Sequence, residues 1–207
     1  RSHRSSALKV VPMDEPLEPV RLDVWLDIAC LFKTRSQAQT ACRGGKVEVV
    51  ELFWYGCPHC YHFEPSLKQW LDSPAARQVD FRRVPAVVNP RWALHARAFY
   101  AARQLGVGDR IHGPLFRVIH EQDRKLDTPA ALADFFAEQG VDRQEFLNAL
   151  RSFAVDVQTR QATQLTRQYQ LSGVPTLIVD GRFRTSGKLA GSYEAMLDTV
   201  DRLVAAT

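Results

Sequence analysis

The chain has no long hydrophobic run. Its 207 residues are 45% hydrophobic and 24% charged, and no window approaches the ~20 apolar residues of a membrane-spanning helix. This balance is typical of a soluble globular protein and argues against a disordered or membrane-embedded one. The first twenty residues also lack the continuous apolar stretch of a secretory signal, so we expect that a signal has been removed or that none existed.

Cysteine is scarce and the net charge is small. Four cysteines are too few for a disulfide-stapled mini-protein, and they are unevenly spaced. Cys30 and Cys42 lie far apart, whereas Cys57 and Cys60 form a C-x-x-C. A net charge of +4 does not identify a nucleic-acid binder, because such proteins concentrate positive charge on one face. Only the C-x-x-C indicates chemistry.

Hydrophobic periodicity predicts an interrupted α/β body behind an N-terminal arm. The predicted elements, in order, are an extended arm at 1–20 with a candidate strand at 8–11, a helix–turn–helix at 21–45, a strand at 47–55, a helix from Pro58 to near Ser73, a strand at 79–88, helices only over 92–171, a strand at 176–179, a hairpin turn at Asp180–Gly181 and a closing helix at 193–205. We therefore expect an α/β domain made of 46–91 and 172–207, with an all-helical insertion at 92–171.

The run Cys57-Pro58-His59-Cys60 stands between the predicted strand and helix. There Cys57 lies beside free backbone N–H groups at the positive end of the helix dipole, which stabilise a thiolate. Cys60, one turn further in, is placed to resolve a disulfide. Pro58 is tolerated in a first helical turn, and His59 can donate a hydrogen bond or a positive charge to the thiolate. The run predicts a redox-active pair that needs no other cofactor.

Two other interpretations of the C-x-x-C are a structural disulfide and half of a zinc site. Zinc needs four ligands, and the sequence has no second C-x-x-C and no matched histidine pair. Four further histidines lack ligand-like spacing and are interpreted as surface or hydrogen-bonded polar side chains; they are His62, His95, His112 and His120. No metal is predicted.

Three segments together resemble the DsbA family of bacterial thiol–disulfide interchange proteins over about 45–203. They are GKVEVVELFWYGCPHCYHFEPSL, VPAVVNPRWALHARAFYAA and SGVPTLIVDGRFRTSGKLAGSYEAMLDTVDRL. The resemblance implies a thioredoxin-like fold with a helical insertion, and an enzyme that donates its Cys57–Cys60 disulfide to unfolded exported proteins. It also implies a periplasmic monomer, reoxidised by a quinone-linked membrane protein of the DsbB type. A reductase or isomerase on the same fold remains an alternative.

The resemblance assigns further residues. It implies that the Val174–Pro175 bond is cis and faces the disulfide, with the backbone groups of Val174 free to pair with an extended peptide. It places Glu51 beneath the active site, where it can move protons to and from Cys60, with Arg83 as its cationic partner. The alternative for Glu51 and Arg83 is a plain ion pair at a strand end, and the alternative for Pro175 is a trans proline in a turn. One or two nearby aromatic side chains are expected to line a substrate groove and the others to be core; they are Phe53, Trp54, Tyr55, Tyr61 and Phe63.

The segment before the α/β body does not fit this family. It resembles half of a small RNA-binding domain shared by a ribosomal small-subunit protein and a heat-shock-induced ribosome-binding protein. Its basic residues would contact RNA phosphates; they are Arg21, Lys33, Arg35 and Lys46. After Val47 the later strands of that domain are missing, so we favour a helical appendage with a solvated basic face over RNA binding. In an oxidising compartment Cys30 and Cys42 would be free thiols or an extra disulfide.

Overall fold

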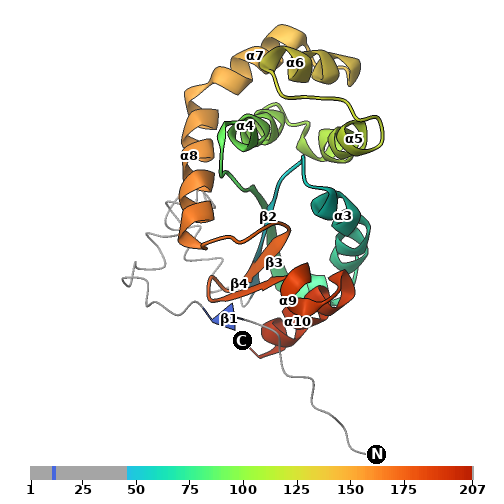
Figure 1. The fold of residues 1–207 in the computed structure, drawn as a ribbon, viewed down its shortest axis with the longest axis vertical. Helices are drawn as coiled ribbons and strands as arrows, with labels where there is room; N and C mark the ends of the chain where they lie inside the picture. The colour runs from blue at the N-terminus through green and yellow to red at the C-terminus, as the bar shows by residue number, and fades with distance from the viewer. Residues whose placement is uncertain (1–10, 13–45, 207) are drawn as a thin grey trace, which may run out of the picture.

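The sheet joins segments that are far apart in the chain (Figure 1). A computed structural model describes residues 11–12 and 46–206, and its strands lie in the order β1-β5-β4-β2-β3. The strands are β1 (Val11–Pro12), β2 (Val47–Phe53), β3 (Val79–Pro85), β4 (Thr176–Val179) and β5 (Phe183–Ser186). Central β2 pairs parallel with β3 and antiparallel with β4. The two halves of the predicted α/β body therefore meet along β2.

Both faces of β2 are buried, as its run of β-branched and aromatic residues predicts. Val50 and Leu52 belong to the hydrophobic cluster that extends into the helices after β3. Val49 belongs to a second cluster, shared with the helices α3 (Pro58–Leu71) and α10 (Tyr193–Ala205). Because successive side chains of a strand point to opposite faces, β2 lies in the middle of a layered core.

The helix α3 connects the parallel strands β2 and β3 through a 3-10 turn at Ala75–Gln78. Its buried face carries Phe63, Leu67 and Trp70, and the indole N–H of Trp70 donates to Asp201 on α10 at 2.8 Å. After β5, a four-residue helix, α9 (Gly187–Ala190), precedes α10. The sequence analysis did not predict α9, because so short a helix has no amphipathic period to detect.

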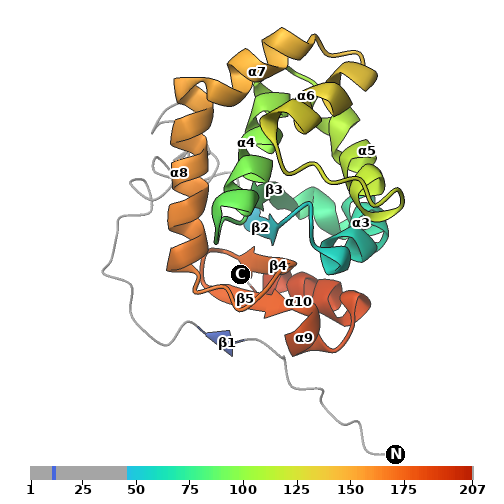
Figure 2. The same ribbon diagram turned by 45° about the horizontal axis from the view of Figure 1, so that its top comes forward.

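The long stretch without strand signals is helical in the structure. It contains α4 (Pro90–Gln104), α5 (Gly108–His120), α6 (Pro129–Glu138), α7 (Arg143–Arg151) and α8 (Phe153–Gln168). These helices gather at one end of the molecule, and α8 runs back to the sheet (Figures 1 and 2). Helix α4 begins at Pro90 and not at Trp92, because Asn89 caps it by accepting from the Trp92 N–H at 3.1 Å.

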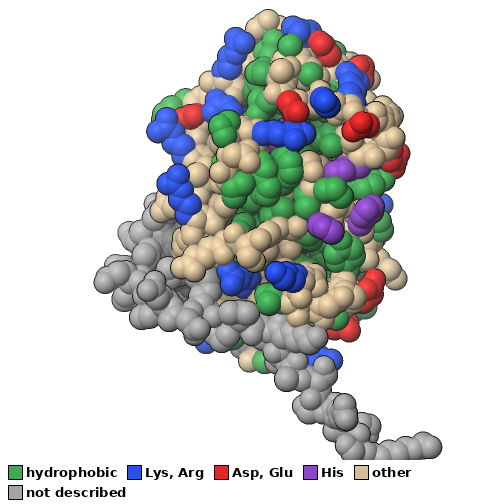
Figure 3. Space-filling view, in the orientation of Figure 1, with side chains coloured by type: hydrophobic (Ala, Val, Ile, Leu, Met, Phe, Trp, Pro, Cys, Tyr) green, Lys and Arg blue, Asp and Glu red, His purple; other side chains and the backbone are tan. Residues whose placement is uncertain are grey.

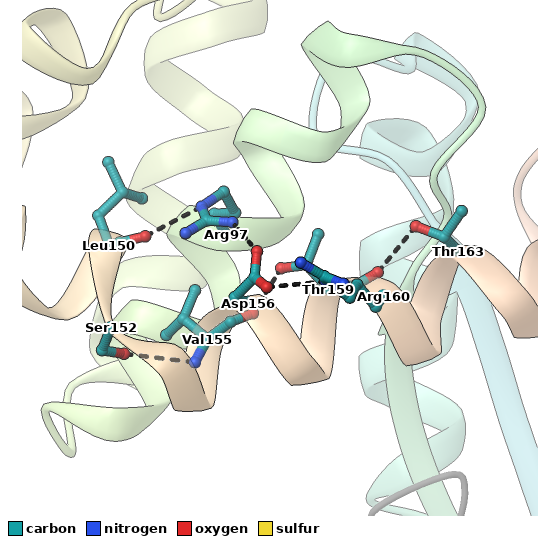
Figure 4. A network of polar contacts seen from close by, with 8 residues as sticks. All are labelled: Arg97, Leu150, Ser152, Val155, Asp156, Thr159, Arg160 and Thr163. Carbon is teal, nitrogen blue, oxygen red and sulfur yellow. Dashed lines mark hydrogen bonds and ion pairs between the residues drawn. The ribbon is translucent and has the colours of Figure 1, made fainter.

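A polar network holds α4 against α7 and α8 (Figure 4). The Arg97 guanidinium donates to the Leu150 carbonyl at 3.0 Å and to Asp156 at 2.8 Å, and Arg160 donates to the second oxygen of Asp156 at 2.8 Å. The hydroxyl of Ser152 caps α8 by accepting from the backbone N–H of Val155 at 3.3 Å. These contacts satisfy helix ends that hydrophobic packing alone would leave without partners.

The predicted α/β elements are confirmed, with small shifts at their ends. Strand β4 and helix α10 have the predicted bounds, whereas β2 ends at Phe53 and β3 at Pro85, each short of the prediction. The hairpin turns at Asp180 and Gly181, which both have positive φ and are the first two of the three residues between the paired Val179 and Phe183. The predicted helix–turn–helix at 21–45 lies outside the described residues. Within the described part of the chain, no helix has the length and apolar character needed to cross a bilayer.

Candidate active site

Cys57 and Cys60 lie where the sequence predicts, at the junction of β2 and α3. Cys57 occupies the N-cap position of α3, and its backbone N–H donates to the Trp54 carbonyl at 3.0 Å, which closes the turn after β2. Both cysteines are free thiols. The side chain of Cys57 is 8% exposed, whereas Cys60 is fully buried. An incoming thiol can therefore reach Cys57 but not Cys60.

The two thiols have opposite acidities. The pKa of Cys57 is lowered to about 6, above all because the Cys60 side chain hydrogen-bonds to it, and then because the backbone N–H groups of Cys60 and His59 do so. Burial opposes this shift, and the charge of His59 makes the smallest of these contributions. Burial raises the pKa of Cys60 well above its ordinary value. In the reduced protein one proton is thus held on Cys60 while Cys57 becomes the thiolate.

The loop before β4 faces the cysteines across the fold. The Val174–Pro175 peptide bond is cis, as the resemblance implies. The thiol of Cys57 donates to the Val174 carbonyl oxygen at 3.3 Å, although the two residues are 117 positions apart. The pairing of Thr176 with Leu52 holds this loop beside the end of β2. Val174 is partly exposed next to the sulfur, where an extended peptide could pair with it.

Glu51 lies fully buried in β2 and interacts electrostatically with Cys60. Its pKa is raised to about 8, first by burial; the charge of Arg83 opposes the shift and that of Glu64 adds to it. The Nε of Arg83 lies 3.0 Å from Glu51 Oε2, but off the direction of a hydrogen bond, so both carboxylate oxygens have no donor among the described residues. Glu51 therefore keeps a proton at neutral pH.

Arg83 is shared with a second carboxylate that the sequence analysis missed. Its guanidinium donates to Glu64 at 3.1 Å, and Glu64 also lies 3.2 Å from His112, which contacts the Tyr55 hydroxyl at 2.9 Å. Burial alone would raise the pKa of Glu64, but His112 and Arg83 outweigh it, and the pKa is lowered. Glu64 is four residues after Cys60 on α3, so helical spacing could have placed it on the same face.

Of the aromatic residues around the motif, Phe53, Tyr55 and Phe63 are buried in the core. Trp54 and Tyr61 are only partly buried. That one or two of the five line a substrate groove stays a prediction. Trp54 stacks on Trp92 of α4 at a centroid distance of 4.4 Å. Hydrophobic side chains gather at the centre of the face seen in Figure 3, with histidine side chains beside them near the start of α3. Pro58 and His59 are exposed at the start of α3.

The four histidines predicted to be surface or hydrogen-bonded polar side chains are so in the structure: His62 is exposed, and the other three are hydrogen-bonded. His95 contacts the Leu126 carbonyl at 3.1 Å, and His120 contacts the Tyr55 carbonyl at 2.7 Å. In the part of the chain that the structure describes, no group of three or more His, Cys, Asp or Glu side chains could hold a metal ion. Of the predicted RNA contacts, Lys46 is exposed, and Arg21, Lys33 and Arg35 lie outside the described residues.

Gly56 is required by the turn that presents Cys57. A Cβ added there would lie 2.4 Å from the Trp54 ring, which is fixed by its stack on Trp92. We expect Gly56→Ala to lower the free energy of unfolding by about 1–3 kcal/mol, because the ring must move. Urea unfolding followed by fluorescence measures this. Gly173→Ala is the control, since its Cβ would meet nothing within 4 Å; equal losses in the two variants would contradict the argument.

Comparison with known proteins agrees with this geometry. The family model described as a DSBA-like thioredoxin domain matches residues 72–195, just after the cysteine pair. A thiol:disulfide interchange protein DsbA from Burkholderia cepacia is 39% identical over 170 residues, covering 82% of this chain and 80% of that protein. The Pseudomonas aeruginosa DsbA is 43% identical over 160 residues, covering 77% and 75%.

Solved structures extend the likeness to the fold. The crystal structure of Pseudomonas aeruginosa DsbA superposes with a TM-score of 0.76 at 36% sequence identity, covering 96% of this chain and 91% of that one. The fold of this chain has a cysteine pair at the start of α3 and five helices between β3 and β4. It agrees with the resemblance seen in the sequence. The chain belongs to the DsbA-like thioredoxin family.

Proposed function

We propose that the chain oxidises pairs of thiols in other proteins by handing on its Cys57–Cys60 disulfide. Its family membership makes it a thiol:disulfide oxidoreductase. The observation that carries the oxidising direction is the lowered pKa of Cys57, to about 6. A stabilised thiolate is a good leaving group and favours the reduced form, so the disulfide that contains it is readily passed on.

The transfer takes two exchange steps. A substrate thiolate attacks Cys57 Sγ, the Cys57–Cys60 bond breaks, and Cys60 leaves with the electron pair and takes up a proton. The result is a mixed disulfide between substrate and Cys57. A second substrate thiolate then attacks the substrate sulfur of that bond, and Cys57 leaves as a thiolate. The substrate dithiol is oxidised and the enzyme dithiol is reduced, with no cofactor besides the cysteine pair.

We assign Glu51 the role of proton donor and acceptor for Cys60. Cys60 is fully buried and its pKa is raised, so it must be protonated when it leaves. Glu51 interacts with it electrostatically and is protonated at neutral pH, with its pKa raised to about 8. Val174 and Pro175 would hold the substrate chain beside Cys57, and His59 and Pro58 would shape the exposed edge of the site.

The natural substrates are proposed to be unfolded polypeptides exported to the periplasm. Disulfides persist in such an oxidising compartment and are rare in the cytosol. The reduced enzyme would be reoxidised by a quinone-linked membrane protein of the DsbB type, and we expect it to act as a monomer. The N-terminal segment is proposed to be an appendage without a role in nucleic-acid binding.

A redox equilibrium with glutathione tests the direction of the reaction. At a fixed ratio of reduced to oxidised glutathione, we expect the Cys57–Cys60 couple to lie toward the dithiol, because the thiolate is stabilised. Trapping the thiols and measuring the mass of the fragment that contains Cys57 and Cys60 gives the ratio of dithiol to disulfide in the protein. Oxidation of a peptide dithiol by stoichiometric enzyme is the second measurement. A couple that stays in the disulfide form, as in a reductase, would overturn the proposal.

A further inference from the structure

Tyr193 reaches the active site from the other end of the chain. It is the first residue of α10, and its hydroxyl donates to the His59 carbonyl oxygen at 3.0 Å across 134 positions of sequence. Its ring packs against Phe63 of α3 at a centroid distance of 5.3 Å, and against Gly187, where a Cβ would lie 3.4 Å from the ring. The ring is therefore fixed, and the hydroxyl is directed at one backbone oxygen.

The contacted oxygen belongs to a peptide group that also faces Cys57. The carbonyl of His59 and the N–H of Cys60 are the two ends of one planar amide. That N–H lies in the first turn of α3, at whose N-cap Cys57 stands, so it is directed toward the Cys57 side chain and contributes to the lowered pKa of this thiol. A donor bound to the oxygen of an amide polarises the group and strengthens the bond made by its N–H. It also fixes the rotation of the peptide plane, and so the direction in which the N–H points.

We propose that Tyr193 is a positioning residue for Cys57 and that it acts through the His59–Cys60 peptide group. The Tyr193 hydroxyl orients the N–H of this peptide group toward the Cys57 sulfur and makes the N–H a stronger donor. Tyr193 does not bond to the reacting sulfur itself. The titratable groups around Cys57 are Cys60 and His59 on α3, Tyr193 on α10, and Glu51 of β2 through Cys60. The proposal deepens the proposed function, because it names a residue that sets how readily Cys57 leaves as a thiolate.

Other observations place the phenol close to the sulfurs. Burial raises the pKa of Tyr193, and the charges of Cys57 and then Cys60 raise it further. The phenol therefore remains a neutral donor through the range in which Cys57 titrates. The hydroxyl of Ser192 caps α10 by accepting from the Ala195 N–H at 3.1 Å, so the helix end that carries the ring is itself held.

Tyr193→Phe tests the proposal, because it removes the hydroxyl and keeps the ring. The variant is made in a background of Cys30→Ala and Cys42→Ala, so that only Cys57 and Cys60 can react. The rate of Cys57 alkylation is followed against pH in the reduced protein. Wild type is expected to reach half its maximum near pH 6. The variant should have a higher midpoint, with about two- to fourfold less thiolate below the midpoint, if a hydrogen bond to a charged group weakens by some tens of per cent.

The redox equilibrium with glutathione gives the second readout, and it should shift toward the disulfide by the same factor. Thr199→Val is the matched control, since it removes another α10 hydroxyl, one that donates to the Ala195 carbonyl. It should leave both readouts at the wild-type values. A Tyr193→Phe variant with the wild-type midpoint and equilibrium would overturn the inference. A wild-type couple that is not oxidising would instead overturn the proposed function, so the two failures are distinguishable.

Discussion

Cys57→Ser is expected to reduce disulfide transfer to the rate seen without enzyme. Cys57 is the only one of the pair with any exposed surface, at 8%, and substrate must attack it because Cys60 is fully buried. Serine is close in size to cysteine and cannot form a disulfide, so the loss comes from chemistry and not from packing. The measurement is oxidation of a peptide dithiol by preoxidised protein, again with Cys30→Ala and Cys42→Ala.

A folding control accompanies this variant. Serine suits position 57, the N-cap of α3, since serine is a preferred residue at helix starts. We therefore expect urea unfolding of Cys57→Ser to be cooperative, with no loss of stability beyond about 1 kcal/mol. Disulfide transfer that persists in a folded Cys57→Ser protein would end the proposed mechanism, because Cys60 has no access to substrate.

Cys60→Ser is expected to trap mixed disulfides on Cys57. Without Cys60 no internal thiol can displace a bound partner, so oxidised glutathione should leave a stable adduct, whereas wild type should proceed to the Cys57–Cys60 disulfide. Intact mass spectrometry measures the adduct in the same Cys30→Ala and Cys42→Ala background. An adduct that forms and is lost at the wild-type rate would contradict the role of Cys60.

Replacing Cys60 by alanine separates its two roles. The Cys60 side chain makes the largest contribution to lowering the pKa of Cys57, and serine can still donate that hydrogen bond whereas alanine cannot. A hydrogen bond to a charged group contributes roughly 1.5–3 kcal/mol, or about 1–2 pH units. Both variants should trap adducts, but only Cys60→Ala should shift the alkylation midpoint of Cys57 upward by that amount. Equal midpoints in the two variants would show that another donor stabilises the thiolate.

The largest influence on Cys57 was not the one that the sequence suggests. The sequence predicts the backbone N–H groups at the helix start and His59 as the partners of the thiolate. The hydrogen bond from the Cys60 side chain comes first, the backbone groups follow, and the charge of His59 is last among the causes. The physical reason is the face of the helix on which each side chain lies. Cys60 is one turn on and faces the Cys57 sulfur, whereas the side chain of His59 is exposed.

Local chemistry determined much of the fold. The run Val47–Phe53 is apolar enough to be buried on both faces, Pro58 opens α3, and the Asp180–Gly181 turn fixes the hairpin between β4 and β5. Each of these follows from backbone preference and side-chain polarity over a few residues. Because the C-x-x-C stands at a predicted strand end, its place at a helix start was also determined by sequence.

The tertiary structure alone decided which distant groups meet at that place. Nothing in the local pattern says that the carbonyl of Val174 lies 3.3 Å from Cys57, that Arg83 is shared between Glu51 and Glu64, or that the hydroxyl of Tyr193 reaches His59. Periodicity reports which face of an element is buried, but not which element covers it. Those contacts arise only when β4 pairs with β2 and α10 packs on α3, and they determine which distant groups surround the sulfur that the sequence had already located.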